Sequence, residues 1–307
     1  MAATDTYLKT RQVADALGVS VSSIKRWVDS GVLEATRTQG RHRLVSLSSA
    51  LEFARRVKLP AEGLLHLSAD SIDARSDAEV REALLVALKA GDAGEARRLL
   101  ISAYRSDRRG DGLADRIVQP VLATVGHAWM LGSWDVYEEH LATQIIILAV
   151  NELIARVSSD PVEGRPLALG GSIEGDHYAL PGLLGELVLR EVGWDVRNLG
   201  YNLPLRSFAR AIRDHKPGLV FLPVGHVADR EAFLRDYAFF YEAATLSGSA
   251  VILGGRALDP ELRSKLIYAS FGDRMVHLAE FARRLLPPAR PIVETEAGHP
   301  SSSPNLD

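Results

Sequence analysis

The stretch PLALGGSIEGDHYALPG, residues 166–182, decides the fold class of the C-terminal half of the chain. Its apolar run at 167–169 predicts a buried strand, the polar residues up to His177 predict a loop, and the apolar period from 180 onward predicts a helix. Ligands of parallel α/β sheets bind beyond the carboxyl ends of strands, so His177 lies where a site is expected. A neutral imidazole is also a common ligand of soft or borderline metals. His177 could instead help to cap the helix that follows.

The residues after this stretch repeat the alternation of apolar strands and helices. The alternation predicts a doubly wound parallel sheet with right-handed crossovers. Gly254 and Gly255 end the last of these strands, where they would let a bulky ligand approach the backbone or form an ordinary turn. Neither G-x-G-x-x-G after the first strand nor G-x-x-x-x-G-K-[ST] is present, so the usual nucleotide-binding fingerprints are excluded. Further strands are expected at 195–199, 218–224 and 250–255, and helices at 205–215, 229–246, 260–268 and 275–286.

The middle of the chain has helical periodicity throughout. Helices are expected at about 77–91, 93–106, 113–130 and 134–157, and their short connections predict an antiparallel four-helix bundle. Trp129 falls in register with Val121 and Val125, which predicts that its indole is buried. Glu139 and His140 lie on the edge of the apolar fourth helix, and a charged pair on a packed face needs a partner.

The first fifty-seven residues have the spacing of a helix-turn-helix followed by a β-hairpin, or wing. Gly18 ends one short helix, and Ser20 caps a second on which Ile24 and Trp27 are apolar at helical spacing. A turn at Gly40 predicts the wing. Exposed cations that merely face solvent are the alternative to DNA contacts. The candidate DNA-binding residues are Ser22, Ser23, Lys25 and Arg26 on the second helix, and Arg37, Arg41, His42 and Arg43 on the wing.

Composition agrees with a protein of the cytoplasm. Hydrophobic residues make up 47% of the 307 residues, charged residues 24%, and cysteine is absent, which excludes disulfides and thiolate chemistry. No uncharged run of about eighteen apolar residues and no signal peptide are found, so no membrane contact is expected. Residues 1–57 carry a net charge of +4 and the remainder −7, which predicts a nucleic-acid contact confined to the N-terminal end.

These patterns divide the chain into five parts. The tail is polar and rich in Pro and Ser, and is expected to be disordered. The predicted parts are a DNA-binding domain at 1–57, a linker at 58–76, the bundle at 77–160, the α/β domain at 161–286 and the tail at 287–307.

Two resemblances follow from these residues. The N-terminal part resembles the winged helix-turn-helix domain of MerR-type regulators and their excisionase-like relatives, through its Leu17-Gly18 turn, its second helix and Gly40-Arg41-His42-Arg43. Residues 5–286 are similar to the CarH/LitR family of light-responsive, cobalamin-dependent transcription regulators. The most specific mark is Trp129, then nine residues, then Glu139-His140. A flavodoxin-like sheet with His177 after its first strand and Gly254-Gly255 after its fourth adds to the likeness.

The resemblance implies that adenosylcobalamin binds between the bundle and the α/β domain, with His177 as the lower axial ligand of cobalt. Trp129 and Glu139 would line the upper face around the adenosyl group, and His140 would lie at or near that face. Asp176 becomes a candidate hydrogen-bond acceptor behind His177. Gly254 and Gly255 would flank the nucleotide tail of the cofactor.

The chain departs from the family pattern in three places. Gly175 stands where the family has a carboxylate two residues before the histidine, and Leu180 stands where it has a glycine three residues after. Pro223 and Val224 replace the usual serine at the end of the third strand. Met130 follows the bundle tryptophan, where the light-adapted form of the family uses a second histidine ligand to cobalt.

The sequence therefore predicts a DNA-binding transcription regulator, a repressor and not an enzyme, that senses light through adenosylcobalamin. It would act as a dimer or tetramer on a double-stranded DNA operator. One alternative is a MerR-type regulator that has lost cobalamin or binds another tetrapyrrole. A second alternative is the corrinoid carrier module of a methyltransferase or mutase, and the winged helix argues against it.

Overall fold

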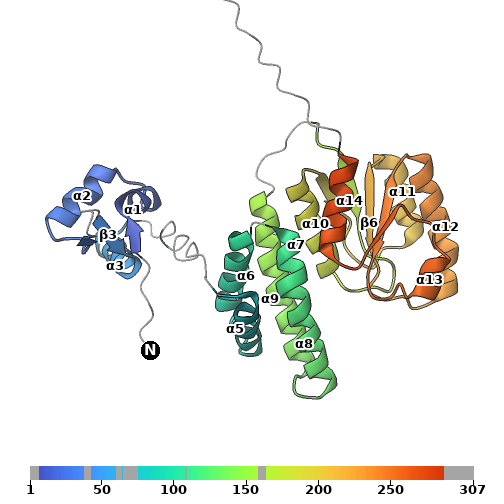
Figure 1. Cartoon of the computed structure of the whole chain (residues 1–307), viewed down its shortest axis with the longest axis horizontal. Coiled ribbons are helices and arrows are strands. Elements are labelled where there is room, and N and C mark those ends of the chain that lie inside the picture. Colours follow the sequence, from blue (N-terminus) through green and yellow to red (C-terminus); the bar gives the residue numbers. More distant parts are fainter. Residues whose placement is uncertain are drawn as a thin grey trace, which may run out of the picture.

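A computed structural model describes residues 7–37, 43–59, 64, 75–107, 109–157 and 164–286. Three structural regions follow one another along the chain: a small N-terminal domain, a helical bundle and an α/β domain (Figure 1). This order matches the fold class predicted from the sequence, including the flavodoxin-like sheet.

The N-terminal domain is a helix-turn-helix with a three-stranded antiparallel sheet. Its middle strand pairs with a short strand at 7–9 that the sequence pattern did not predict. Trp27 packs on Phe53 with ring centroids 4.9 Å apart, which joins the second helix to the third. The elements are β1 (Tyr7–Lys9), α1 (Thr10–Ala16), α2 (Val21–Asp29), β2 (Thr36–Arg37), β3 (Arg43–Ser46) and α3 (Leu47–Val57).

The bundle has four long helical segments, as predicted, but the third is not a regular α-helix. It begins at Gly110, three residues earlier than expected, and includes a π-helical turn before Pro120. Leu84, Leu99, Val121 and Ile146 are among the residues buried in its core. The segments are α5 (Asp77–Lys89), α6 (Ala93–Asp107), the run of α7 (Gly110–Leu113), η1 (Ala114–Val118) and α8 (Gln119–Met130), and α9 (Val136–Val157).

Of the described helices, α9 alone is long and apolar enough to cross a membrane by composition. One face of it, including Ile146, Val150 and Leu153, is buried in the bundle core. Packing within the bundle therefore accounts for its apolar composition.

The α/β domain has a five-stranded parallel sheet in the order β5-β4-β6-β7-β8. Helices α10 and α14 cover one face, and α11 and α12 cover the other (Figure 1). The fifth strand, β8, was not predicted. The elements are β4 (Leu167–Gly170), α10 (Leu180–Val192), β5 (Asp195–Asn198), α11 (Leu205–His215), β6 (Leu219–Pro223), α12 (Arg230–Leu246), β7 (Ala250–Gly254), α13 (Pro260–Ser264), β8 (Ser270–Gly272) and α14 (Met275–Leu285).

The strand order fixes the position of the site. The chain turns from β4 to β5 on one side and then crosses back to β6 on the other side of β4, so β4 and β6 are adjacent in the sheet. Such a reversal of direction opens a crevice at the carboxyl ends of these two strands. The loops after β4 and β6 therefore form the expected binding edge.

The bundle and the α/β domain share a continuous core. Leu180, Leu184 and Leu187 of α10 belong to the same buried cluster as the bundle helices. The buried Asp115 carboxylate accepts the backbone N–H groups of Met275 and Val276, at 2.8 and 3.1 Å, and so caps α14 from the bundle. Relative motion of the two parts would have to break these contacts.

Glu191 gives this junction a dependence on pH. Its Oε2 accepts the Gly110 N–H at 2.8 Å, and burial raises the pKa of the Glu191 carboxyl above its ordinary value. A raised pKa in the folded state means that this group stabilises the fold at low pH, and that the contribution is lost as pH rises through the folded pKa. We therefore expect Glu191→Gln, which has no proton to lose and cannot acquire a buried charge, to gain stability relative to the native chain over the pH range that begins near 4.5, the ordinary pKa of glutamate. Urea unfolding at a series of pH values measures this, and a constant difference across that range would contradict it.

Candidate functional site

His177 lies in the loop after β4, at the carboxyl edge of the sheet. Its side chain is exposed, and its ring lies edge-on to Tyr201, with centroids 6.5 Å apart. The start of the loop is fixed by the buried Ser172, whose N–H donates to the Gly200 carbonyl at 2.9 Å and whose carbonyl accepts the Leu203 N–H at 3.0 Å. The imidazole is therefore presented to whatever lies above this edge, and helix capping does not account for it. The N-cap position of α10 is Ala179.

Asp176, the residue before His177, is turned into the protein. Its side chain is buried and accepts N–H groups from Tyr178 at 3.1 Å, Gly225 at 2.5 Å and His226 at 3.3 Å. The carboxylate thus ties the loop after β4 to the loop after β6. Among the described residues no hydrogen bond joins Asp176 to His177, so in this structure Asp176 positions the loop instead of supporting the imidazole directly.

Gly175 is required by the same loop. Its φ is +80°, a conformation that side chains other than glycine rarely adopt, and its N–H donates to Asn202 Oδ1 at 2.9 Å. The structure therefore explains why glycine stands two residues before His177. A carboxylate at this position would need a different loop.

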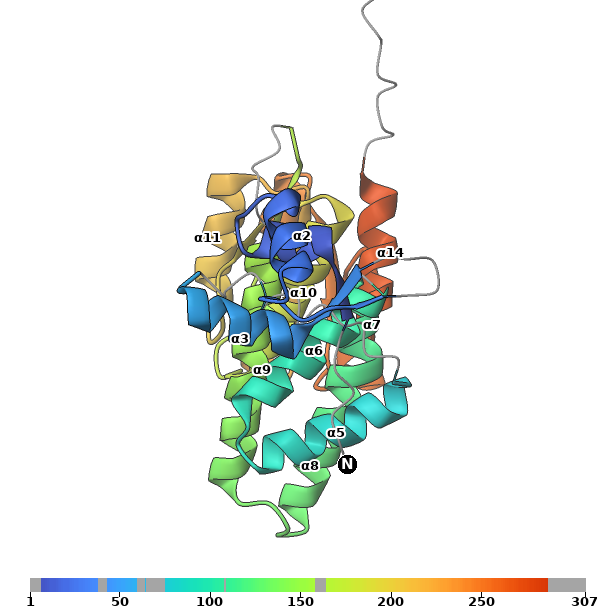
Figure 2. The same cartoon turned by 90° about the vertical axis from the view of Figure 1, so that its left-hand side faces the viewer.

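Trp129 contradicts the prediction that it is buried. Its side chain is 48% exposed, and Met130 and Leu131 after it are 70% exposed. Val121 and Val125 are buried, but the last turn of α8 lies at the end of the bundle, where the chain turns back into α9 (Figure 1). Figures 1 and 2 show this end extending past the α/β domain, on the side where α13 follows the carboxyl end of β7.

The two adjacent glutamates at the start of α9 have different surroundings. Glu138 accepts from Lys89 at 2.5 Å and from the Asp135 N–H at 2.7 Å, so it closes the corner between helices, and the Lys89 hydrogen bond lowers the pKa of its carboxyl. Glu139 is half-buried; among the described residues its carboxylate accepts the Thr143 hydroxyl at 3.2 Å and lies 3.5 Å from His140 Nε2. Of Glu138, Glu139 and His140, the last two therefore have polar atoms that could still bind a ligand.

Gly254 and Gly255 are explained by backbone packing. A Cβ atom at Gly254 would lie 2.4 Å from the Gly272 carbonyl oxygen, and one at Gly255 would lie 2.2 Å from that of Val224. Gly255 also has a φ of +112°. Backbone atoms of Gly272 and Val224 thus fill the space beside these two glycines. An ordinary turn with tight backbone packing therefore accounts for both glycines without a ligand.

Phe221 fills a second glycine-lined space, between β4 and α10. Its side chain is 3% exposed, and its ring would lie 2.0 Å from a Cβ at Gly170 and 3.0 Å from one at Gly185. The aromatic ring of β6 therefore occupies the slot that these glycines create beneath the binding edge.

Three side chains at the edge were missed by sequence reasoning: Tyr178, His226 and Arg256. The Arg256 guanidinium lies 4.9 Å from the Tyr178 ring centroid and donates to the Gly225 carbonyl at 3.4 Å. Each of the three follows a strand end, and that position is the signal that could have found them.

The candidate DNA-binding residues divide into three groups. Lys25 and Arg26 are exposed on α2, and Ser22 and Ser23 lie on its first turn, where their hydroxyls are 2.8 and 2.9 Å from that of Ser20. Arg43 forms an ion pair with Asp29 at 2.6 Å, which uses part of its capacity for phosphate. Arg41, His42 and the side chain of Arg37 lie outside the described residues.

Removal of the two exposed cations of α2 should weaken DNA binding by removing ionic contacts with the phosphates. Each phosphate contact contributes about one unit to the slope of log K against log salt. We expect Lys25→Ala with Arg26→Ala to reduce that slope by about 1–2 and affinity at 150 mM salt by about 10-fold or more. Arg210→Ala, an exposed arginine of α11 in the α/β domain, is the control. Titration of a DNA fragment selected from a random pool, at several salt concentrations, measures the slope, and an unchanged slope would remove α2 from the interface.

Comparisons with known proteins agree with this arrangement. Residues 7–58 match a family model for a helix-turn-helix domain, and residues 80–154 match one for a B12 binding domain. Over 242 residues the chain is 28% identical to the HTH-type transcriptional repressor CarH of Myxococcus xanthus, covering 71% of this chain and 78% of that protein. The chain thus combines a helix-turn-helix domain with a B12 binding domain, and it is similar to CarH over most of its length.

Two further proteins are similar to parts of this chain. An uncharacterized protein of Mycobacterium bovis is 38% identical over 102 residues, which cover 33% of this chain and 82% of that protein. The monomethylamine corrinoid protein of Methanosarcina barkeri is 13% identical with a TM-score of 0.58, over 69% of this chain and 100% of that one. At this identity the likeness concerns the fold alone.

The donor set fits the metal side of a corrinoid. Within the described residues no group of three or more His, Asp or Glu side chains could hold a metal ion. The His177 imidazole therefore suits a metal that carries its other ligands with it, as a cobalt held in a corrin macrocycle does. The tail side fits less well, because Phe221 and the backbones beside Gly254 and Gly255 leave no slot at those positions for the aromatic base.

Proposed function

We propose that this regulator is a cytoplasmic, homo-oligomeric repressor that senses light through adenosylcobalamin held between the bundle and the α/β domain. The observation that carries the proposal is the exposed imidazole of His177 at the switch point of the sheet. His177 would bind cobalt through its imidazole. When bound, the cofactor supplies a cobalt–carbon bond that green light breaks.

The free end of the bundle supports the upper half of this site. Trp129 offers an exposed apolar surface suited to cover a flat adenosyl group, and Glu139 and His140 offer polar atoms beside it. These side chains would contact the adenosyl group when it is present and lose that contact when it has left. A switch requires such a difference in contacts between its two states. The core shared through α10 and α14 would pass that change to the rest of the chain.

DNA binding would be assigned to α2 and the wing, and an oligomer would bring several copies of α2 onto one operator. Repression follows when the dark, cofactor-bound form binds the operator and the illuminated form releases it.

A second candidate is a regulator that binds another tetrapyrrole. The observation that favours it is Phe221, whose ring occupies the slot beneath the binding edge. A flat macrocycle without a nucleotide tail would need no such slot, and His177 would serve its metal equally well.

One experiment separates these candidates. The full chain is purified in the dark with adenosylcobalamin, and its absorbance, its size on gel filtration and its binding to selected DNA are measured before and after green light. The proposal expects a retained corrinoid spectrum that light changes, together with a smaller assembly and weaker DNA binding. Absence of any retained corrinoid would refute it, and a different pigment in protein purified from its own cells would support the second candidate.

A further inference from the structure

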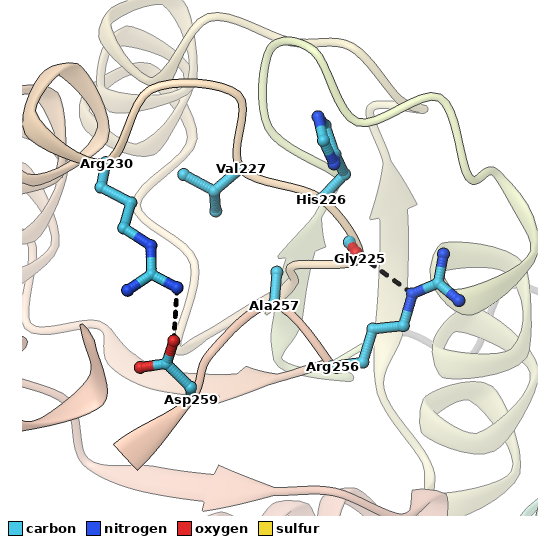
Figure 3. Close-up of a pocket in the computed structure, with 7 residues that line it drawn as sticks. All are labelled: Gly225, His226, Val227, Arg230, Arg256, Ala257 and Asp259. Atoms are coloured by element: carbon cyan, nitrogen blue, oxygen red, sulfur yellow. Dashed lines mark hydrogen bonds and ion pairs between the residues drawn. The ribbon is translucent and has the colours of Figure 1, made fainter. Parts of the chain in front are cut away.

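A shallow hollow of about 350 Å³ lies in the loops that follow β6 and β7 (Figure 3). It is bounded by the loop that follows each strand. The residues that line it are Gly225, His226, Val227, Arg230, Arg256, Ala257 and Asp259.

The hollow is lined by two arginines and one aspartate, and the aspartate pairs with one of the arginines. Arg230 and Asp259 point toward each other and form an ion pair (Figure 3), so their charges offset. Arg256 has no carboxylate partner among the described residues, and its contacts are the Tyr178 ring and the Gly225 carbonyl. At 3.4 Å the latter is a weak hydrogen bond. The hollow therefore has one positive charge that no carboxylate in the described part of the chain neutralises.

Arg256 is linked to both loops that surround His177. Tyr178, over which its guanidinium stacks, is the next residue after His177, and Gly225 donates its N–H to Asp176, the residue before. A side arm of a ligand bound at the imidazole would meet this arginine if the arm followed Tyr178, the next residue along the chain.

The interior of the sheet offers that arm no place in this structure. Phe221 fills the slot beside Gly170 and Gly185, and the Val224 carbonyl closes the position above Gly255. An aromatic base on the arm would therefore remain at the surface, near the hollow.

We propose that Arg256 binds the phosphodiester of the nucleotide tail of the corrinoid and holds the tail along the edge of the sheet. This inference rests on the proposed function. A guanidinium matches the geometry of two phosphate oxygens, and stacking on Tyr178 orients it before the ligand arrives. If Arg256 fixes the tail, the aromatic base of the tail would stay away from cobalt, and His177 would be free to bind the metal.

The test compares two ligands that differ only in the tail. Adenosylcobinamide lacks the phosphodiester, ribose and base that adenosylcobalamin carries, and binding of each is followed in the dark by quenching of tryptophan fluorescence. The native chain should bind adenosylcobalamin about 10- to 100-fold more tightly than adenosylcobinamide. Arg256→Gln should reduce this preference to within about threefold by weakening adenosylcobalamin alone.

Arg263→Gln is the matched control. Arg263 also stacks on an aromatic ring, that of Phe271 at 4.4 Å, but on α13 outside the hollow. Its loss should leave the preference intact. A preference that survives in Arg256→Gln would belong to the ribose or base and would overturn the assignment, as would equal binding of both ligands by the native chain. If the native chain binds neither ligand, the proposed function fails as well.

Discussion

Replacing His177 with alanine is expected to produce a protein that no longer retains corrinoid through gel filtration, with affinity reduced by more than about 100-fold. Loss of a group that merely supports a metal ligand already costs 10–100-fold, and His177 would be the ligand itself. The neighbouring Asp176 cannot replace it, because its carboxylate is buried and accepts three backbone N–H groups. The spectrum of any residual bound cofactor should lack the signature of a histidine ligand.

The control for this variant is His215→Ala. His215 ends α11 at the opposite edge of the sheet and lies 3.0 Å from Arg197, so it shares the residue type and not the position. The affinity of His215→Ala for the corrinoid should stay within about threefold of the native value, a change in binding free energy of less than about 0.7 kcal/mol. Circular dichroism and thermal unfolding establish that both variants fold. Full retention of the cofactor by folded His177→Ala would end the assignment of this imidazole to cobalt.

The arrangement of the α/β domain could be predicted because its signals are strong. Apolar strands alternating with helices leave few topologies, since crossovers between parallel strands are right-handed. β1 and β8 were missed because three residues provide too little of the alternating pattern to be recognised. The π-helical turn at 114–118 was also missed, because a single altered turn barely changes the helical period.

The site was predicted less completely, for reasons that lie in tertiary structure. Helical periodicity indicates which face a residue occupies but not where the neighbouring helices end, so it placed Trp129 in a core that does not reach it. Sequence distance likewise gave no sign that Asp176 would turn toward Gly225, 49 residues later. Arg256 was overlooked because an isolated cation is unremarkable until its lack of a carboxylate partner is visible.

Gly255→Ala is expected to lower the free energy of unfolding by about 2–5 kcal/mol. Two effects add: alanine is strained at a φ of +112°, and its Cβ would lie 2.2 Å from the Val224 carbonyl oxygen and 2.8 Å from the Val224 nitrogen. Backbone atoms at the end of a buried strand cannot move aside as a flexible side chain would. Relief of the clash would separate the loop after β6 from β7, and with it the Gly225 contact that supports the His177 loop.

Gly248→Ala separates strain from crowding. Gly248 has a φ of +70° but nothing within 4 Å of the position that an alanine methyl group would take, so only the conformational cost remains, about 1 kcal/mol. Urea unfolding of the two variants measures the difference, which we assign to the contact with Val224. If Gly255→Ala were as stable as Gly248→Ala and lost only its affinity for corrinoid, the glycine would serve ligand approach, as the family resemblance implied, and the packing explanation would be wrong. An unfolding free energy that falls well below that of Gly248→Ala, before any cofactor is added, would instead establish that Gly255 is needed to bring the β6 and β7 loops together.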